Sequence, residues 1–70
     1  MVDSYYISFA IQLRKARDMR NLSQSELAKL CDLHPSHVAH FESGSRKPSL
    51  DIFRKIVVAT RLPANYFLGL

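Results

Sequence analysis

The 70-residue chain is poor in the residues that cross-link or interrupt a fold: one cysteine, two glycines, three prolines and no tryptophan. A single cysteine cannot form a disulfide within the chain, so packing alone must hold the fold, which suits a reducing compartment. The glycines and prolines build no hairpin signal, so strands are not indicated. We expect one domain, residues 1–70, near the lower size limit for folding without disulfides or bound metal.

Long apolar runs are also missing. No stretch approaches the roughly 20 apolar residues that a membrane-spanning helix requires. The segment from Met1 to Tyr6 lacks the basic start and apolar stretch of a signal peptide, and no lipidation motif is present. We therefore expect no membrane partner.

Acidic residues are few relative to basic ones: ten Lys or Arg stand against six Asp or Glu, a formal net charge of +4. In a small domain this balance favours a polyanionic partner, and with the membrane set aside it indicates nucleic acid. Hydrophobic residues make up 47% of the chain, enough for a compact core.

Apolar residues recur at helical spacing along the chain and predict an all-α fold. The first helix is expected to carry Tyr6, Phe9, Leu13 and Ala16 on its inward face. Asn21 then suits the end of that helix, because Asn tolerates the left-handed conformation. The pattern predicts five helices in one compact domain: 4–20, 23–31, 35–43, 49–60 and 63–68.

Residues that start and stop helices support these ranges. Ser23 and Glu26 have the spacing of a capping box, Pro35 fits the first position of the third helix, and Gly44 fits its end. Ser49 is placed to cap the fourth helix. That helix is expected to turn a set of apolar side chains inward: Leu50, Phe53, Ile56, Val57 and Ala59.

The segment from Ser23 to Glu42 reads as two short helices joined by a tight turn. With Val38 and Phe41 facing the core, the opposite face of the third helix is small or hydrogen-bonding and has no acidic side chain. A solvated face is usually richer in Lys and Glu, whereas a face of this kind can approach base edges in a DNA groove. Its residues are Ser36, His37, Ala39, His40 and Ser43.

From Phe9 to Leu68 the chain resembles a lambda-repressor-like helix-turn-helix domain of the Cro and phage-repressor type, also called the xenobiotic-response-element family. The residues that carry the resemblance are Leu13-Arg14, Arg17, Leu22-Ser23-Gln24-x-Glu26-Leu27-Ala28, Val38, Phe41-Glu42-x-Gly44 and Arg46-Lys47-Pro48-Ser49-Leu50. The resemblance implies a five-helix domain whose second and third helices form the DNA-reading unit. It also implies a cytoplasmic protein, prokaryotic or phage-encoded, that binds inverted-repeat operators in double-stranded DNA as a homodimer.

The resemblance also implies roles for single residues. Arg17 and Glu42 match a partly buried ion pair between the first and third helices, which is structural. The positions that read or border bases are Ser36, His37 and His40. The positions that contact the DNA backbone are Gln24, Ser43, Ser45, Arg46 and Lys47. The start of a helix favours an anion, and basic residues beside the end of the third helix neutralise phosphate, so the physics agrees with these assignments.

Three positions depart from the family pattern. Asp32 replaces the usual turn glycine, which adds strain and a negative charge near the DNA side. His34 stands where Ser or Thr commonly caps the third helix, so we expect a weaker cap. Pro35 stands where a long polar side chain often reads bases, so direct readout is left to its neighbours and specificity per half-site should be modest.

Metal binding and catalysis fit the sequence less well than DNA binding does. Cys31, His34, His37 and His40 recur every three residues, but the turn before the third helix breaks their register and Cys31 is needed in the core. We therefore expect neither a metal site nor a cofactor. No nucleophile, base and acid come together in so short a chain, so we do not expect an enzyme.

Three functions remain. The first is a sequence-specific transcriptional regulator, expected to be a repressor. The second is a protein-interaction module, an antitoxin or adaptor, that also binds DNA. The third is a basic domain that binds nucleic acid without sequence preference. Near the C-terminus, a set of apolar side chains is expected either to close the core or to meet a second copy: Tyr66, Phe67, Leu68 and Leu70.

Overall fold

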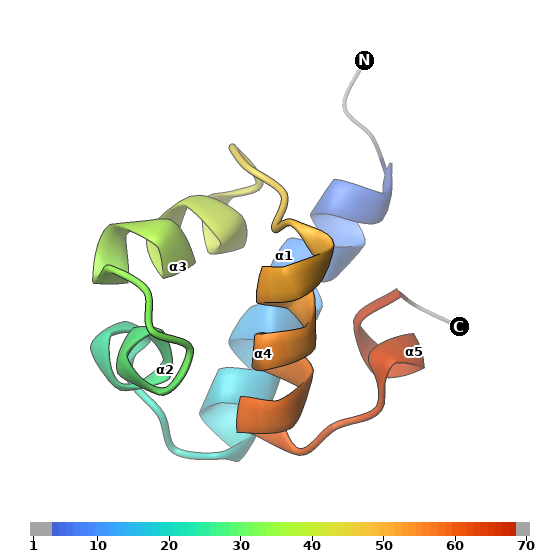
Figure 1. Cartoon of the computed structure of the whole chain (residues 1–70). Coiled ribbons are helices and arrows are strands. Elements are labelled where there is room, and N and C mark those ends of the chain that lie inside the picture. Colours follow the sequence, from blue (N-terminus) through green and yellow to red (C-terminus); the bar gives the residue numbers. More distant parts are fainter. Residues whose placement is uncertain (1–3, 69–70) are drawn as a thin grey trace.

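The computed structural model describes residues 4–68, and the side chains from residue 8 onward. The described residues form five helices and no strand: α1 (Ser4–Met19), α2 (Gln24–Leu30), α3 (Pro35–Ser43), α4 (Leu50–Thr60) and α5 (Ala64–Leu68) (Figure 1). This confirms the expected all-α fold. Each helix begins and ends within one residue of its expected bounds, because the expected ranges included the capping residues.

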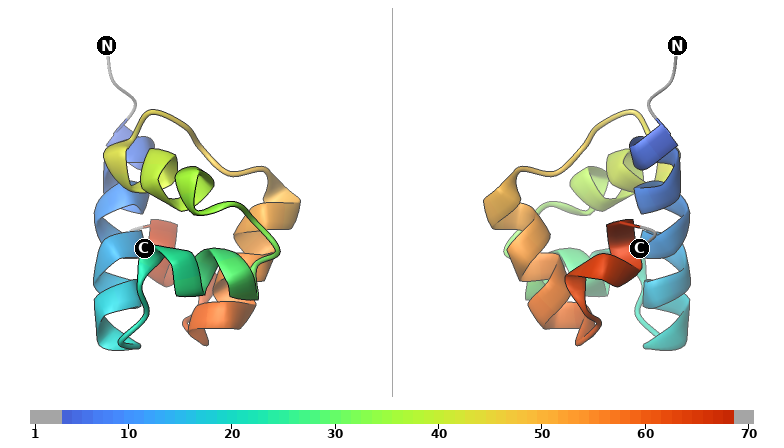
Figure 2. Two further views of the ribbon diagram at one scale, coloured as in Figure 1. Left: turned by 90° about the vertical axis from the view of Figure 1, so that its left-hand side faces the viewer. Right: turned by 90° about the vertical axis from the view of Figure 1, so that its right-hand side faces the viewer.

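The helices pack so that one side of α3 is left uncovered. α1 packs against both α3 and α5, while α2 packs against α3 and α4. Figure 2 shows α2 and α3 together on one side of the molecule and α5 on the opposite side. Within the part of the chain that the structure describes, no other helix lies over the outer side of α3. Among these helices none is both long and apolar enough to cross a membrane.

The core joins all the helices through aliphatic and aromatic side chains. Leu13 of α1, Leu27 of α2, Ile56 of α4 and Phe67 of α5 are completely buried. The ring of Phe9 lies at the centre of an aromatic cluster, with ring centroids 6.5 Å from Phe41, 6.0 Å from Phe53 and 6.0 Å from Phe67. Two side chains expected to pack, those of Tyr6 and Leu70, lie outside the described side chains.

Local hydrogen bonds start and end the helices. The amide of Glu26 donates to Ser23 Oγ at 3.0 Å, and the amide of Ser23 donates to Glu26 Oε1 at 2.9 Å, so the capping box is formed. Ser49 Oγ accepts from the amide of Ile52 at 3.2 Å and caps α4. Positive φ angles occur where chain direction changes, at Asn21 (56°), Asp32 (57°), Gly44 (78°) and Arg61 (58°).

The inward face of α4 differs from expectation at its first residue. Leu50 was expected in the core, but it is 83% exposed: it lies in the first turn of α4, on an open groove that Phe9 and Phe53 also line. Thr60, at the other end of α4, is buried instead and satisfies its hydroxyl by donating to the carbonyl of Ile56 at 2.8 Å. Arg20 Nε donates to the carbonyl of Thr60 at 2.7 Å and so ties the end of α1 to the end of α4.

Candidate nucleic-acid interface

Helix α3 has an inner and an outer face of different chemistry. Val38 and Phe41 are almost fully buried, at 1% and 3% exposure, against the core. On the outer side Ser36, Ala39, His40 and Ser43 are exposed, while His37 is half-buried. The exposed residues of the helix are small or hydrogen-bonding and carry no carboxylate, as base edges and phosphates require of an approaching surface.

An ion pair holds α3 against α1. Arg17 Nε lies 2.7 Å from Glu42 Oε2, and Arg17 Nη2 donates to Glu42 Oε1 at 3.0 Å, a two-pronged geometry that fixes both side chains. Arg17 also donates through Nη1 to the carbonyl of Leu22 at 2.9 Å. The hydrogen bond from Arg17 to Glu42 raises the pKa of the guanidinium, and desolvation opposes this. Arg17 and Glu42 are therefore bound to each other rather than presented at the surface.

Gln24 connects this ion pair to the outer surface. Its Nε2 donates to Glu42 Oε1 at 3.2 Å, and the side chain is half-buried at the start of α2. A primary amide has two N–H groups, so this bond uses only one of them. The contact sets the direction of the Gln24 side chain relative to α3.

The N-terminal end of α3 is capped by imidazoles. His34 Nδ1 accepts from the amide of Ser36 at 3.1 Å and lies 2.9 Å from Ser36 Oγ. His37 Nδ1 in turn accepts from the amide of His34 at 3.3 Å. These are the two reciprocal bonds of a capping box, with ring nitrogens in place of the usual oxygens. Both bonds, at 3.1 and 3.3 Å, are longer than the 3.0 and 2.9 Å bonds of the Ser23 capping box.

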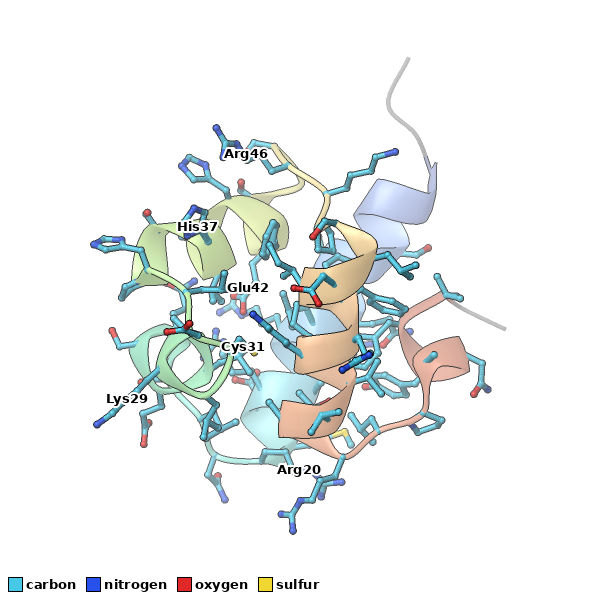
Figure 3. All side chains as sticks on the ribbon, in the orientation of Figure 1. Arg20, Lys29, Cys31, His37, Glu42 and Arg46 are labelled. Atoms are coloured by element: carbon cyan, nitrogen blue, oxygen red, sulfur yellow. The ribbon has the colours of Figure 1, made fainter. Side chains whose placement is uncertain are left out.

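Hydroxyls gather at the C-terminal end of α3. Ser43 Oγ and Ser45 Oγ are both placed to donate to the carbonyl of His40, at 3.0 and 3.2 Å, and they lie 2.9 Å apart. His40 Nδ1 lies 3.1 Å from Ser45 Oγ. The helix then ends at Gly44 in the left-handed conformation, and the following loop carries Arg46 and Lys47, both exposed. Figure 3 shows Arg46 and His37 on the outer side of the molecule, with Glu42 on the inner side of α3, toward the other helices.

The family model that matches the chain is a helix-turn-helix model, and it matches residues 13–67. This range contains the two helices and the turn described above, α2 and α3, with their supporting helices. The chain belongs to this helix-turn-helix family. Its resemblance to the Cro and phage-repressor type is thereby confirmed.

Two relatives of known name match most of this helix-turn-helix chain. Control protein C.BamHI of Bacillus amyloliquefaciens is 37% identical over 57 residues, which are 80% of this chain and 70% of that protein. The crystal structure of the restriction-modification controller protein C.AhdI from Aeromonas hydrophila superposes with a TM-score of 0.86 at 31% identity, covering 93% of this chain and 98% of that chain.

Other matches are more distant or partial. The gene regulator ClgR from C. glutamicum shares the fold, with a TM-score of 0.84 at 18% identity over 93% of this chain and 84% of that one. An HTH-type transcriptional regulator of Archaeoglobus fulgidus is 45% identical over 47 residues, 67% of this chain. This chain spans 20% of the length of that relative.

Cys31 and His34 are two further polar or reactive groups in this helix-turn-helix unit. Cys31 is buried at 1% exposure, and this burial raises the pKa of its thiol while the nearby Lys55 ammonium acts in the opposite direction. Its side chain is thus inside the core, whereas His34 and His40 are exposed. The sequence predicts a weaker cap at His34 but does not give the reciprocal bonds that this residue makes with Ser36 and His37. The spacing of three residues from His34 to His37, as in a Ser-x-x-Glu box, is the signal that predicts them.

Proposed function

We propose that this protein is a sequence-specific transcriptional regulator that places α3 in the major groove of double-stranded DNA and acts as a repressor. Binding over a promoter is sufficient for repression, so the proposal assigns no catalytic residue and no cofactor. The protein would act in the cytoplasm, where a prokaryotic or phage operator is accessible. Membership of the helix-turn-helix family supports the DNA-reading role.

The observation that carries the proposal is the uncovered, carboxylate-free outer face of α3 beside a basic loop. A helix with a purely structural role would not need a carboxylate-free outer face, because that face would contact only water and could carry any charge. A net charge of +4 adds long-range attraction to phosphate. The helix-turn-helix geometry then brings the beginning of α3 closest to the bases.

Within this proposal the residues divide between two kinds of contact. Base edges would be read by Ser36, His37 and His40. The DNA backbone would be held by Gln24, Ser43, Ser45, Arg46 and Lys47. The second N–H of the Gln24 amide suits a phosphate oxygen, and the bond to Glu42 would pre-orient it. The two basic side chains of the loop would contribute attraction that depends on salt.

The test is selection of bound duplexes from a random pool, followed by fluorescence anisotropy titration of the enriched and a scrambled duplex. A two-fold symmetric motif bound at least about 1000-fold more tightly than the scrambled duplex is expected. Arg46→Gln and Lys47→Gln should each reduce the slope of log affinity against log salt by about 1.8, because each removes one phosphate contact, worth about 0.9, from each subunit of a bound dimer. Equal affinity for both duplexes would instead identify a basic domain without sequence preference.

We further propose that the protein binds as a homodimer through the side that carries Leu50. Leu50, Phe53, Phe9 and Leu68 line an open groove of about 430 Å³ between α1, α4 and α5. An exposed leucine beside a groove of this kind is suited to burial by a second copy, and half-sites one helical turn apart require such pairing.

The dimer is tested by sedimentation of two charge variants on the same helix. Leu50→Lys should lower the dimer fraction and the affinity for the two-fold motif. Val58→Lys serves as a matched control, because Val58 is also exposed on α4, at 69%, but does not line this groove. An unchanged dimer fraction in Leu50→Lys would place the interface elsewhere.

A narrower role, control of a restriction-modification system, is supported by the nearly complete mutual coverage with C.AhdI. The measurement is a reporter fused to promoters of endonuclease and methyltransferase genes near the gene for this protein. We expect expression of the protein to change reporter output, and the change should disappear in the double variant Arg46→Gln, Lys47→Gln. Reporter output that does not respond to the protein would argue against this narrower role.

A further inference from the structure

We propose that His37 selects its base as a hydrogen-bond donor, because the backbone of His34 fixes its ring in the Nε2–H tautomer, and that the selected base is guanine. The inference rests on the proposed function and adds to it that His37 contacts its base as a hydrogen-bond donor. It follows from hydrogen bonds at the N-terminal end of α3.

The first step is the tautomer of His37. A backbone N–H can only donate, and the amide of His34 points at His37 Nδ1 at 3.3 Å. The Nδ1 atom must therefore be the unprotonated nitrogen. In the neutral ring the hydrogen then lies on Nε2, so the other side of the imidazole is a donor.

The donor and acceptor roles of the neighbouring residues are fixed in the same way. His34 Nδ1 accepts from the amide of Ser36 at 3.1 Å, so it too carries no hydrogen. Ser36 Oγ lies 2.9 Å from that nitrogen and must donate to it, which leaves the lone pairs of the hydroxyl as acceptors. The start of the reading face therefore has fixed polarity, with a donor at His37 and an acceptor at Ser36.

His40 provides a contrast within the same helix. Its Nδ1 faces Ser45 Oγ at 3.1 Å, and the single hydrogen of that hydroxyl can go either to this nitrogen or to the carbonyl of His40 at 3.2 Å. Neither tautomer of His40 is selected by a backbone group in this way. The fixed polarity thus belongs to the N-terminal end of α3 and is not a general property of its imidazoles.

The pattern of the major groove decides which base suits a fixed donor. Cytosine presents only its N4 amino donor there, and adenine places an N6 donor beside N7. Guanine presents two adjacent acceptors, N7 and O6, so a single donor meets no competing donor. Thymine has one acceptor, O4, next to a methyl group. A donor at His37 Nε2 therefore favours guanine and disfavours cytosine most strongly.

Two substitutions separate the ring nitrogens. The Asn amide oxygen stands near the place of Nδ1 and still accepts from the His34 amide, but nothing reaches the place of Nε2. The Gln amide nitrogen reaches the place of Nε2 as a donor, but offers the His34 amide no acceptor. His37→Asn should thus keep the helix cap and lose the hydrogen bond to guanine. His37→Gln should keep the hydrogen bond to guanine and lose part of the helix cap.

The experiment compares selected sequences, affinities and thermal unfolding for these variants. Wild type and His37→Gln should enrich guanine at the same position of each half-site, and His37→Asn should not. Replacing that guanine with cytosine, which presents only a donor in the major groove, should weaken wild-type binding roughly tenfold and leave His37→Asn nearly unchanged. His37→Gln should unfold at a lower temperature than His37→Asn, while His40→Gln and His40→Asn should unfold at similar temperatures.

A separate measurement addresses the tautomer without DNA. Nitrogen-15 NMR of the free protein above neutral pH should show protonated Nε2 and unprotonated Nδ1 for His37 and His34. The opposite tautomer of His37 would overturn the inference, as would enrichment of cytosine or retained guanine preference in His37→Asn. If no sequence is enriched at all, both the proposed sequence-specific binding and the selection of guanine are wrong. The NMR result still decides the tautomer of His37.

Discussion

At the scale of the residue, Asp32 holds a conformation that costs an L-amino acid free energy. Its φ angle is 57° in the turn between α2 and α3, where glycine has no Cβ penalty. We expect Asp32→Gly to raise the free energy of unfolding by about 0.5–1 kcal/mol, after the loss of chain entropy is subtracted. Urea denaturation measures this change.

Asp32→Asn is the matched control for charge, because Asn tolerates the same conformation about as well as Asp. Its stability should stay close to that of the wild type, while both variants bind DNA more tightly through the loss of one negative charge. If Asn stabilises as much as Gly, then charge repulsion rather than backbone strain limits stability at this turn.

Glu26 gives the stability a dependence on pH. Hydrogen bonds from the amide and the hydroxyl of Ser23 lower the pKa of this carboxyl below its ordinary value of 4.5. A group whose pKa is lower in the folded state stabilises above its unfolded pKa, and this contribution is lost as the pH falls through the folded value. Glu26→Gln should therefore be less stable than the wild type near neutral pH.

The difference between Glu26→Gln and wild type should close well below pH 4.5, where both side chains are uncharged. Thermal unfolding across this range is the measurement. A constant difference at all pH values would contradict the role of the carboxylate charge, since Gln keeps an oxygen acceptor for the same amide.

At the scale of the element, α3 depends on its ion pair with α1. The side chains of Arg17 and Glu42 are only 13% and 7% exposed, so removal of one partner leaves a poorly hydrated charge. We expect Arg17→Met to lower the free energy of unfolding by about 3–5 kcal/mol, and the double variant Arg17→Met, Glu42→Met to recover much of it. Denaturant titration of the wild type, Arg17→Met, Glu42→Met and the double variant gives the coupling energy.

Additive losses in the double variant would show that the pair does not act as a unit. DNA binding by the folded double variant should stay weaker than that of the wild type even where its stability is recovered, because Glu42 also holds the Gln24 amide. Arg17→Lys is informative beside them, since Lys keeps the charge but cannot make the two-pronged contact.

The elements differ in how far the sequence predicts them. The five helices and the Ser23–Glu26 box were predictable, because periodicity and caps are local signals. Leu50 was placed wrongly, since its apolar character says nothing about whether a neighbouring helix extends past the first turn of α4. The bond from Arg20 to the carbonyl of Thr60 joins positions 40 residues apart and has no local signal.

The sequence predicts which residues lie on the outer face of α3, but not which of their atoms donate and which accept hydrogen bonds. The outer residues of α3 follow from the inward positions of Val38 and Phe41, which the helical period fixes. The direction of each hydrogen bond does not follow from residue type, because an imidazole can present either tautomer. Only the placement of the His34 amide against His37 selects one.

At the scale of the whole molecule, the aromatic cluster links distant parts of the fold. Phe67 of α5 is completely buried, and its ring lies 6.0 Å from Phe9 and 5.9 Å from Phe53. We expect Phe67→Ala to cost about 3–5 kcal/mol, a large share of the 5–15 kcal/mol typical of a domain. DNA binding should weaken although α5 lies on the opposite side from α3.

Alkylation of Cys31 measures this loss directly, because the thiol is buried in the folded protein and becomes reactive when the chain opens. The rate should rise strongly in Phe67→Ala and little in Val58→Ala, whose side chain is 69% exposed in the wild type. Similar rates in the two variants would show that α5 is not required for the packing around Cys31.

The hydrogen bonds described for the outer face of α3 have an evolutionary consequence. Those made by His34, His37, His40 and Ser43 end on partners between residues 34 and 45, whereas Glu42 bonds to α1 and α2. Substitutions on the outer face therefore leave the anchoring contacts in place. Descendants of this protein can acquire new operators by single substitutions there, while the contacts that hold α3 to α1 and α2 stay in place.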